Sequence, residues 1–464
     1  MVVSGQGASQ RTRPHRTKPP AGRPQTEDKP GLPARKAAAR LLGAVIDART
    51  PLDALTDGEH GHPQFLSLDQ RDRALVRAIL VSALRHRCTV EKLITQRLER
   101  PLPPNAHSLS HILHVAAAQI LFLDVPDSAA VDLAVAQAKD DPRAQRFSGL
   151  VNGVLRNIAR QKEVALPEAL ASTRDAPVWF AERLEAIYGR EHADAVLEAH
   201  RIEPPVDFTV KSDPQLWAER LGGRVLPNGS VRIQRLTASV PELPGYAEGE
   251  WWVQDAAASL PARLLGDVAG LAVADLCAAP GGKTAQLALA GARVTAVDIS
   301  ASRLKRLNTN LERLRLSADI VKADLLVWNP DRKFDAVLLD APCSSTGTVR
   351  RHPDVPWTKS PEDIAKLAQL QRKFLESALR LVRPGGLVVF SNCSLDPAEG
   401  EDLLRQLLAE RPDVALEPIL PQELPGAEHF VTAEGFLRTT PATGDGEGRL
   451  GEVDGFCAAR LRPL

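Results

Sequence analysis

The sequence predicts an α/β protein in which an all-helical domain precedes a doubly wound parallel sheet. Apolar residues recur at helical spacing between about residues 36 and 165. From about residue 270 onward, short apolar strands alternate with helices, which is typical of parallel strands joined by crossover helices. A glycine-rich turn joins the first of these strands to a helix.

At 464 residues, the chain has room for roughly three domains. The pattern divides it into four parts. They are a basic arm at 1–35, a helical domain at 36–165, a linker with a small mixed α+β subdomain at 166–269, and the α/β domain at 270–464.

The composition is that of a soluble globular protein, with 44% hydrophobic and 25% charged residues and no net charge. No apolar run reaches the ~18 residues of a transmembrane helix, and the N-terminus lacks the apolar core of a signal peptide. The five cysteines are scattered, without a Cys-x-x-Cys pair. This argues against a disulfide framework or a zinc site, and we expect a cytoplasmic protein without a metal.

The arm carries an excess of positive charge. Up to Lys36 there are eight basic residues against Glu27 and Asp28, with six prolines between them. Such a composition predicts disorder. Two interpretations stay open: a solvated tail, or a segment attracted non-specifically to RNA phosphates.

The helical domain should be a compact bundle, because the segments between its helices are mostly short. We expect Asp69 to cap the second helix, and Pro51 and Pro126 to follow the ends of the first and third. The helices are expected at 36–46, 75–84, 112–123, 131–138 and 150–158.

The middle of the chain is mixed. Residues 206–210 indicate a strand, and 221–236 indicate short strands. A helix is expected at 256–265, kinked at Pro261. For Trp251 and Trp252, which precede it, core packing is favoured over base stacking.

The glycine-rich turn lies within Val273–Thr284, where Gly281 and Gly282 let the backbone approach a ligand closely. Asp298 ends the second strand, at the place where an acid holds ribose hydroxyls. A phosphate-binding loop of the nucleotide-triphosphate type fails because Cys277 replaces its first glycine, and Gly-x-Gly-x-x-Gly is absent. The turn therefore favours a cofactor with ribose and adenine but little phosphate, such as S-adenosylmethionine.

Further strands and one long helix follow. The helix is expected at 361–382, closed by Pro384-Gly385-Gly386. The strands are expected at 319–321, 334–339, 387–390 and 455–461.

Two cysteines, Cys343 and Cys393, each follow an apolar strand and begin a polar turn. Functional groups gather at the carboxyl ends of such strands, so neighbouring strands would bring the two thiols together. A thiolate beside a methyl donor suits methylation of a pyrimidine at C5: its addition to C6 makes C5 nucleophilic. Asp340 could hold the cytosine edge by hydrogen bonding.

Three motifs together resemble the Sun family of RNA cytosine-C5 methyltransferases. They are Asp-Leu-Cys-Ala-Ala-Pro-Gly-Gly-Lys-Thr, Asp-Ala-Pro-Cys-Ser and the Cys393-Ser394 turn, and the stretch 346–354 adds to the match. The resemblance covers roughly residues 36–464. It implies a Rossmann-like methyltransferase domain and an N-terminal domain similar to the NusB fold, an RNA-binding domain.

The resemblance also implies a set of site residues. Cys393 would be the nucleophile, and Cys343 would assist release of the product. S-adenosylmethionine would be surrounded by Cys277, Ala278, Ala279, Pro280, Gly281, Gly282, Lys283, Asp298, Asp324 and Asp340. Two departures affect local positioning: Asn392 stands where the family has threonine, and residues 397–401 replace a more acidic run.

The implied substrate is 16S rRNA or a small-subunit assembly intermediate, bound by a monomer, without a membrane or a metal. Arg350 and Arg351 are expected to contact phosphates. The target base must leave any stack, which favours a loop or partly unfolded RNA. The alternatives are methylation of tRNA or large-subunit rRNA, a non-enzymatic NusB-like RNA-binding protein, and an ATPase, which Cys277 disfavours. A further alternative is Cys343 as the nucleophile, because its Pro-Cys turn resembles that of DNA cytosine-C5 methyltransferases.

Overall fold

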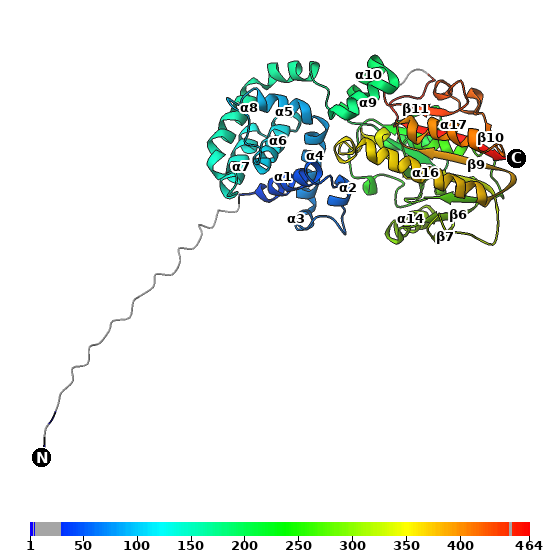
Figure 1. The fold of residues 1–464 in the computed structure, drawn as a ribbon, viewed down its shortest axis with the longest axis horizontal. Helices are drawn as coiled ribbons and strands as arrows, with labels where there is room; N and C mark the ends of the chain where they lie inside the picture. Colours follow the sequence, from blue (N-terminus) through cyan, green and yellow to red (C-terminus); the bar gives the residue numbers. More distant parts are fainter. Residues whose placement is uncertain (3, 5–28, 445–447) are drawn as a thin grey trace.

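The computed structural model describes residues 1, 2, 4, 29–444 and 448–464 (Figure 1). The predictions for the basic arm fall mainly on residues 5–28, which lie outside the described part of the chain. Helix α1 begins at Leu32, so the last four residues assigned to the arm are helical. Pro33 lies in the first turn of this helix, where its missing N–H removes no hydrogen bond.

The N-terminal region is a helical bundle that lies beside the α/β domain (Figure 1). Its core is a continuous cluster of buried apolar side chains drawn from α1 to α8. The five predicted helices are confirmed, and Asp69 caps α4 by accepting a hydrogen bond from the Asp72 N–H at 2.7 Å. The helices of the bundle are α1 (Leu32–Ile46), α2 (Leu52–Leu55), α3 (Pro63–Leu66), α4 (Gln70–Arg85), α5 (Arg87–Thr95), α6 (His107–Phe122), α7 (Asp127–Asp140) and α8 (Ser148–Ala171). Two further helices, α9 (Val178–Tyr188) and α10 (Arg190–Arg201), pack against residues of the α/β domain.

A small antiparallel sheet follows, in the order β2-β3-β1-β4. It comprises β1 (Val206–Val210), β2 (Arg224–Val225), β3 (Val231–Ile233) and β4 (Trp251–Val253), with α11 (Pro214–Leu221) between β1 and β2. Trp251 is fully buried and meets Phe208 edge to face, with ring centroids 4.7 Å apart. Trp252 is also buried, so core packing is confirmed for both tryptophans.

The helix expected at 256–265 is shorter than predicted. A 3₁₀ turn at Ala257–Ser259 leads into α12 (Leu260–Arg263). Pro261 lies in the first turn of α12, where it causes no kink because no intrahelical partner is needed for its nitrogen.

The large sheet has eight strands in the order β10-β12-β9-β8-β5-β6-β7, with β11 paired to β12. The chain runs outward from β5 to β7 and then returns to β8, so the strand order reverses between β5 and β8. This confirms the doubly wound sheet, although β12 is antiparallel to β9. The strands are β5 (Ala272–Leu276), β6 (Arg293–Asp298), β7 (Asp319–Lys322), β8 (Phe334–Asp340), β9 (Val382–Asn392), β10 (Val414–Glu417), β11 (Leu437–Thr439) and β12 (Phe456–Pro463).

Both faces of this sheet are covered, because successive strand residues enter opposite cores. Val273 packs with α12 and α13 residues on one face, whereas Ala274 packs with α16 and α17 residues on the other. The helices are α13 (Gly282–Leu289), α14 (Ala301–Leu314), α15 (Val355–Thr358), α16 (Pro361–Leu381) and α17 (Glu401–Glu410).

Strand β9 differs from its prediction. It begins at Val382, so Pro384-Gly385-Gly386 lies within the strand rather than before it. The pairing with β8 shifts register between Phe334 and Ala336, and this irregularity accommodates the extra residues. Helix α17 and strands β10 and β11 had no sequence prediction.

Candidate active site

The glycine-rich turn joins β5 to α13, as the sequence predicts. Gly281 has φ +103°, and a Cβ there would lie 2.8 Å from Leu307 Cγ, so a side chain would not fit. Cys277 also has a positive φ of 58°. Burial raises the pKa of its thiol well above the ordinary value. Its thiol is therefore not reactive, and its contribution to the turn is its backbone.

Asp298, at the end of β6, is buried against this turn. Its Oδ2 accepts a hydrogen bond from the Ala279 N–H at 3.3 Å, and its Oδ1 accepts one from the Ser300 N–H at 2.9 Å. Asp324, beyond the end of β7, is exposed and accepts a hydrogen bond from the Leu326 N–H at 3.0 Å. The two acids therefore end neighbouring strands at the same edge of the sheet.

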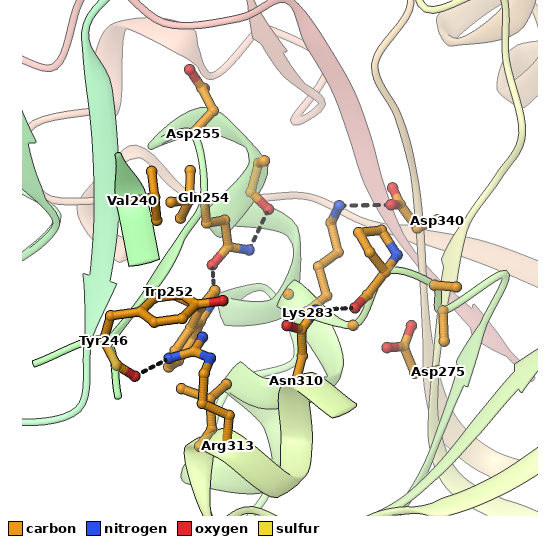
Figure 2. Close-up of a pocket in the computed structure, with 18 residues that line it drawn as sticks. Val240, Tyr246, Trp252, Gln254, Asp255, Asp275, Lys283, Asn310, Arg313 and Asp340 are labelled. Atoms are coloured by element: carbon orange, nitrogen blue, oxygen red, sulfur yellow. Dashed lines mark hydrogen bonds and ion pairs between the residues drawn. The ribbon is translucent and has the colours of Figure 1, made fainter. Parts of the chain in front are cut away.

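Lys283 and Asp340 form an ion pair at the point where the strand order reverses. Lys283 Nζ lies 2.7 Å from Asp340 Oδ2 (Figure 2), and Ser391 Oγ donates to the other oxygen at 2.9 Å. The lysine is largely buried and its ammonium lies over the Phe456 ring, 5.2 Å from the centroid. Asp340 is therefore fixed by groups from α13 and β9.

A cavity of about 360 Å³ opens beside this pair, between the small sheet and the glycine-rich turn (Figure 2). The turn, Lys283 and Asp340 line it, together with Tyr246 from the segment before β4. The guanidinium of Arg313 lies over the Tyr246 ring, 4.1 Å from its centroid. Asp298, Asp324 and the two strand-end cysteines 343 and 393 do not line this cavity.

Sequence reasoning missed Asp275, which also lines the cavity and is fully buried. Its Oδ2 accepts a hydrogen bond from Thr284 Oγ1 at 2.5 Å, whereas its Oδ1 has no partner among the described residues. Burial raises the pKa of this carboxyl to about 7. The sequence did contain a sign of this role, because Asp275 is a single acid within an otherwise apolar strand. A buried acid in such a position needs a polar partner.

Cys343 and Cys393 lie together at the ends of neighbouring strands β8 and β9. Their sulfur atoms are 3.4 Å apart. The hydrogen bond to Cys393, together with burial, raises the pKa of Cys343 well above the ordinary value. The protonated form of Cys343 is therefore favoured, and either sulfur can be the donor in the contact between the two.

The two departures from the family pattern contact each other directly behind these thiols. Asn392 Nδ2 donates to the Glu399 carbonyl at 2.6 Å, and Asn392 Oδ1 accepts from the Ser394 N–H at 2.9 Å. At Gly400, a Cβ would lie 2.8 Å from Cys457 Sγ, so the space of a larger residue is already filled. Asn392 thus connects the turn of Cys393 to the 397–401 segment.

The expectation for Arg350 and Arg351 is wrong. Arg350 is only 3% exposed, and both guanidinium groups form ion pairs with Asp255 and Asp454 at distances of 2.7–3.3 Å. Their charges are already neutralised by these aspartates, so they are not available to RNA phosphates. The Arg-Arg pair in the sequence does not indicate that its partners are two buried acids, each about 100 residues away.

The loop that follows Cys343 also contacts the helical domain. The Leu52 N–H donates to Asp354 Oδ2 at 2.9 Å, and Arg85 donates to the Arg350 carbonyl at 2.8 Å. Trp357 packs against the core of the helical bundle. The two domains therefore meet at the segment that leads away from the Cys343 turn.

The described residues contain neither a membrane-spanning helix nor a metal-binding cluster. No helix in the described part of the chain combines the length and apolar character that crossing a membrane requires. Within the same residues, no cluster of three or more histidine, cysteine or acidic side chains could hold a metal ion.

This strand order, with a glycine-rich turn and acids at the carboxyl edge of the sheet, defines a Rossmann-like methyltransferase. Residues 263–462 match the family described as 16S rRNA methyltransferase RsmB/F, and residues 32–160 match the NusB family. The chain belongs to the family of ribosomal RNA small subunit methyltransferase B.

Individual relatives agree with this assignment. The chain is 33% identical to Ribosomal RNA small subunit methyltransferase B of Cronobacter sakazakii over 421 residues, which cover 87% of this chain and 96% of the relative. It is 36% identical over 419 residues to the protein of that name from Salmonella paratyphi B, covering 86% and 95%. The crystal structure of PH0851 shares the fold, with a TM-score of 0.68 at 23% identity, covering 94% of this chain and 99% of that one.

Proposed function

We propose that the protein transfers a methyl group from S-adenosylmethionine to C5 of a cytidine in 16S rRNA, through a covalent bond between Cys393 and C6 of the base. One observation carries this proposal: two thiols lie 3.4 Å apart beside an acid held by a lysine, at the switch point of a methyltransferase sheet. The names of the relatives support the RNA class.

The described residues fit the cofactor. The turn at 277–283 would bring its backbone close to the ligand, and Asp298, which ends β6 and contacts this turn, would accept the ribose hydroxyl hydrogens. The unpartnered Oδ1 of Asp275 suits a donor such as the ammonium of the methionine moiety. Asp324 and Asp340 complete the row of acids at this edge. When bound, S-adenosylmethionine supplies an electrophilic methyl group.

In this proposal Cys393 gives its proton to water and attacks as the thiolate, while Cys343, whose pKa is raised by the contact with Cys393 and by burial, keeps its proton. The Cys393 sulfur forms a bond to C6, and the C5–C6 π electrons become available at C5 for attack on the methyl group. Asp340, held by Lys283, accepts a hydrogen bond from the amino group on the edge of the cytosine.

Cys343 then removes the C5 proton. Once Cys393 is bonded to C6, its sulfur no longer accepts the hydrogen bond that is the main cause of the raised Cys343 pKa. Cys343 can therefore lose its proton to water and take the proton from C5. The C5–C6 double bond forms again, the S–C6 bond breaks, and the thiol of Cys343 and the thiolate of Cys393 are restored.

The substrate side of the proposal follows from the family and the chemistry. The base must reach two partly buried sulfurs, so it must be unstacked and flipped out of any helix. We propose that the NusB-like domain binds 16S rRNA, free or in a small-subunit assembly intermediate, and that the protein acts as a cytoplasmic monomer without a metal.

Two measurements test this function. Bisulfite sequencing of rRNA from a deletion strain should show the loss of methylation at one 16S cytidine, restored by the wild-type chain but not by Cys393→Ala. Calorimetry should show binding of S-adenosylmethionine. Loss of a methylated cytidine from tRNA or large-subunit rRNA would instead identify that RNA as the substrate. RNA binding without methyl transfer would indicate a non-enzymatic NusB-like RNA-binding protein.

A further inference from the structure

Glu399 is a buried carboxyl group that lies between the turns of the two cysteines. It ends the 3₁₀ turn Pro397–Glu399, and its exposure is 0%. Its Oε1 accepts hydrogen bonds from the Ser344 N–H at 2.9 Å and from Gln371 Nε2 at 2.8 Å. Its Oε2 accepts from Ser394 Oγ at 2.6 Å and from Ser344 Oγ.

The two serines are the residues that directly follow Cys343 and Cys393 in the sequence. One carboxyl group therefore connects the backbone and hydroxyl of one cysteine turn to the hydroxyl of the other. These turns come from separate strands, and their serine hydroxyls also lie 3.2 Å from each other. Glu399 thus joins the two turns from behind, together with Thr346, whose Oγ1 lies 3.3 Å from Ser344 Oγ and 3.1 Å from Ser394 Oγ.

We propose that Glu399 is a positioning residue that clamps the Cys343 and Cys393 turns at reactive spacing. The charge of its carboxylate also favours the protonated form of Cys343. This inference rests on the proposed function for its catalytic consequence. It goes beyond that function because Glu399 contacts neither thiol and would contact neither RNA nor cofactor.

Burial raises the pKa of Glu399, whereas the hydrogen bonds that it accepts from Ser344 and Ser394 oppose this shift and favour the carboxylate. Two N–H groups can only donate to Oε1, and two hydroxyls donate to Oε2, so all four contacts are with donors. The contact with Cys393 and burial are the main causes of the raised pKa of Cys343; the charge of Glu399 adds to them, and the Ser345 N–H acts in the opposite direction. Asp396, nearby in the sequence, acts on Glu399 itself.

The test compares Glu399→Gln with the wild type in two assays. Alkylation by iodoacetamide, resolved for Cys343 and Cys393 by mass spectrometry across pH, needs neither RNA nor cofactor. Loss of the charge should move the Cys343 profile to lower pH by about 0.5–1 unit. In methyl transfer, kcat should fall roughly tenfold or more, with the KM for S-adenosylmethionine unchanged.

Two variants separate charge from shape. Glu399→Asp keeps the charge, so its Cys343 profile should stay near that of the wild type although kcat falls. Glu376→Gln removes a half-exposed carboxyl on α16 that pairs with Arg372, and it should change neither assay. If Glu399→Gln does not fold, Ser394→Ala tests the clamp alone, and it should slow adduct formation severalfold.

The outcomes separate this inference from the proposed function. If the pH profile of Cys343 alkylation is unchanged in Glu399→Gln, the charge of Glu399 has no role. If the rate of adduct formation is unchanged in Ser394→Ala, the clamp is overturned. Either result leaves methyl transfer by the wild type intact. If the wild type methylates no RNA, the proposed function fails, while the alkylation profiles still decide whether Glu399 controls the thiol pair.

Discussion

The backbone N–H of Leu52 donates to the carboxylate of Asp354, 302 residues later in the chain, at 2.9 Å. Asp354 is 4% exposed, and it lies in the loop that leads away from Cys343. The helical domain is therefore attached to the loop that follows Cys343 by a buried hydrogen bond. Removing this bond should affect stability and catalysis together.

Asp354→Ala should lower the free energy of unfolding by about 1–3 kcal/mol, because it leaves the Leu52 N–H buried without an acceptor. Methyl transfer should slow, while S-adenosylmethionine affinity stays the same. Denaturant unfolding and single-turnover assays measure both. Asp53→Ala is the control, because its side chain is 76% exposed and pairs with His352 in the same interface; an equal loss there would argue against a special role for Asp354.

The two cysteines should differ in which mutant retains the covalent adduct. Cys393→Ala should lose methylation and adduct. Cys343→Ala should still attack C6 but fail to release the product, so a protein–RNA complex resistant to denaturant should accumulate on denaturing gels. RNA with 5-fluorocytosine at the target should trap the wild type in the same way.

Cys88→Ala serves as the control for the gels, because burial raises the pKa of Cys88 to about 11 and its thiol lies in the helical domain. It should behave like the wild type. An adduct with Cys393→Ala and none with Cys343→Ala would reverse the assignment of the nucleophile.

Asp298→Ala should weaken S-adenosylmethionine binding by about 1.5–3 kcal/mol, the range for a hydrogen bond to a charged group. The same carboxylate holds the Ala279 and Ser300 N–H groups, so some loss of stability is also expected. Calorimetric titration gives the affinity. Asp319→Ala, at an exposed position on β7, should leave it unchanged, and unaltered binding by Asp298→Ala would remove this acid from the site.

The protein should become less stable as the pH decreases, because His200 is buried in its neutral form. Burial lowers the pKa of this imidazole to about 3. The unfolded chain takes up a proton near its ordinary value of ~6.5 while the folded chain does not, so stability is complete above pH 6.5 and declines below it. At pH 5 the loss should be about 2 kcal/mol, and His200→Leu should lack this component in denaturant titrations at both pH values.

The basic arm should contribute to RNA affinity in a salt-dependent way. Each phosphate that it neutralises adds about −0.7 to −0.9 to the log–log slope of affinity against salt. Deletion of residues 1–28 should flatten the slope and leave methyl transfer at saturating RNA unchanged. An identical slope would identify the arm as a solvated tail.

Much of the fold was predictable because local patterns and the global fold agree. The strand, glycine turn and helix around Gly281 follow from short-range signals, as does the cap at Asp69. The sequence also located the ends of β8 and β9. The proximity of Cys343 and Cys393 then followed from the assumption that these two strands are neighbours in the sheet.

The rest depends on contacts between distant segments, which periodicity does not encode. Arg350 and Arg351 have the composition of a phosphate site, but Asp255 and Asp454 neutralise them. Nor does any spacing relate Glu399 to Ser344, 55 residues earlier. Polar residues within an apparent loop can be either solvated or buried, and only the fold decides which.

The buried ion pairs around Arg350 have a consequence for sequence divergence. Asp207, Asp255 and Asp454 balance Arg232, Arg350 and Arg351, and the Glu452 carbonyl accepts from both Arg232 and Arg350. Loss of one member of a buried pair costs about 3–5 kcal/mol, because its partner remains as an uncompensated charge. Selection should remove single replacements at these positions. Relatives should therefore either keep all six charged residues or replace an acid and its arginine partner together.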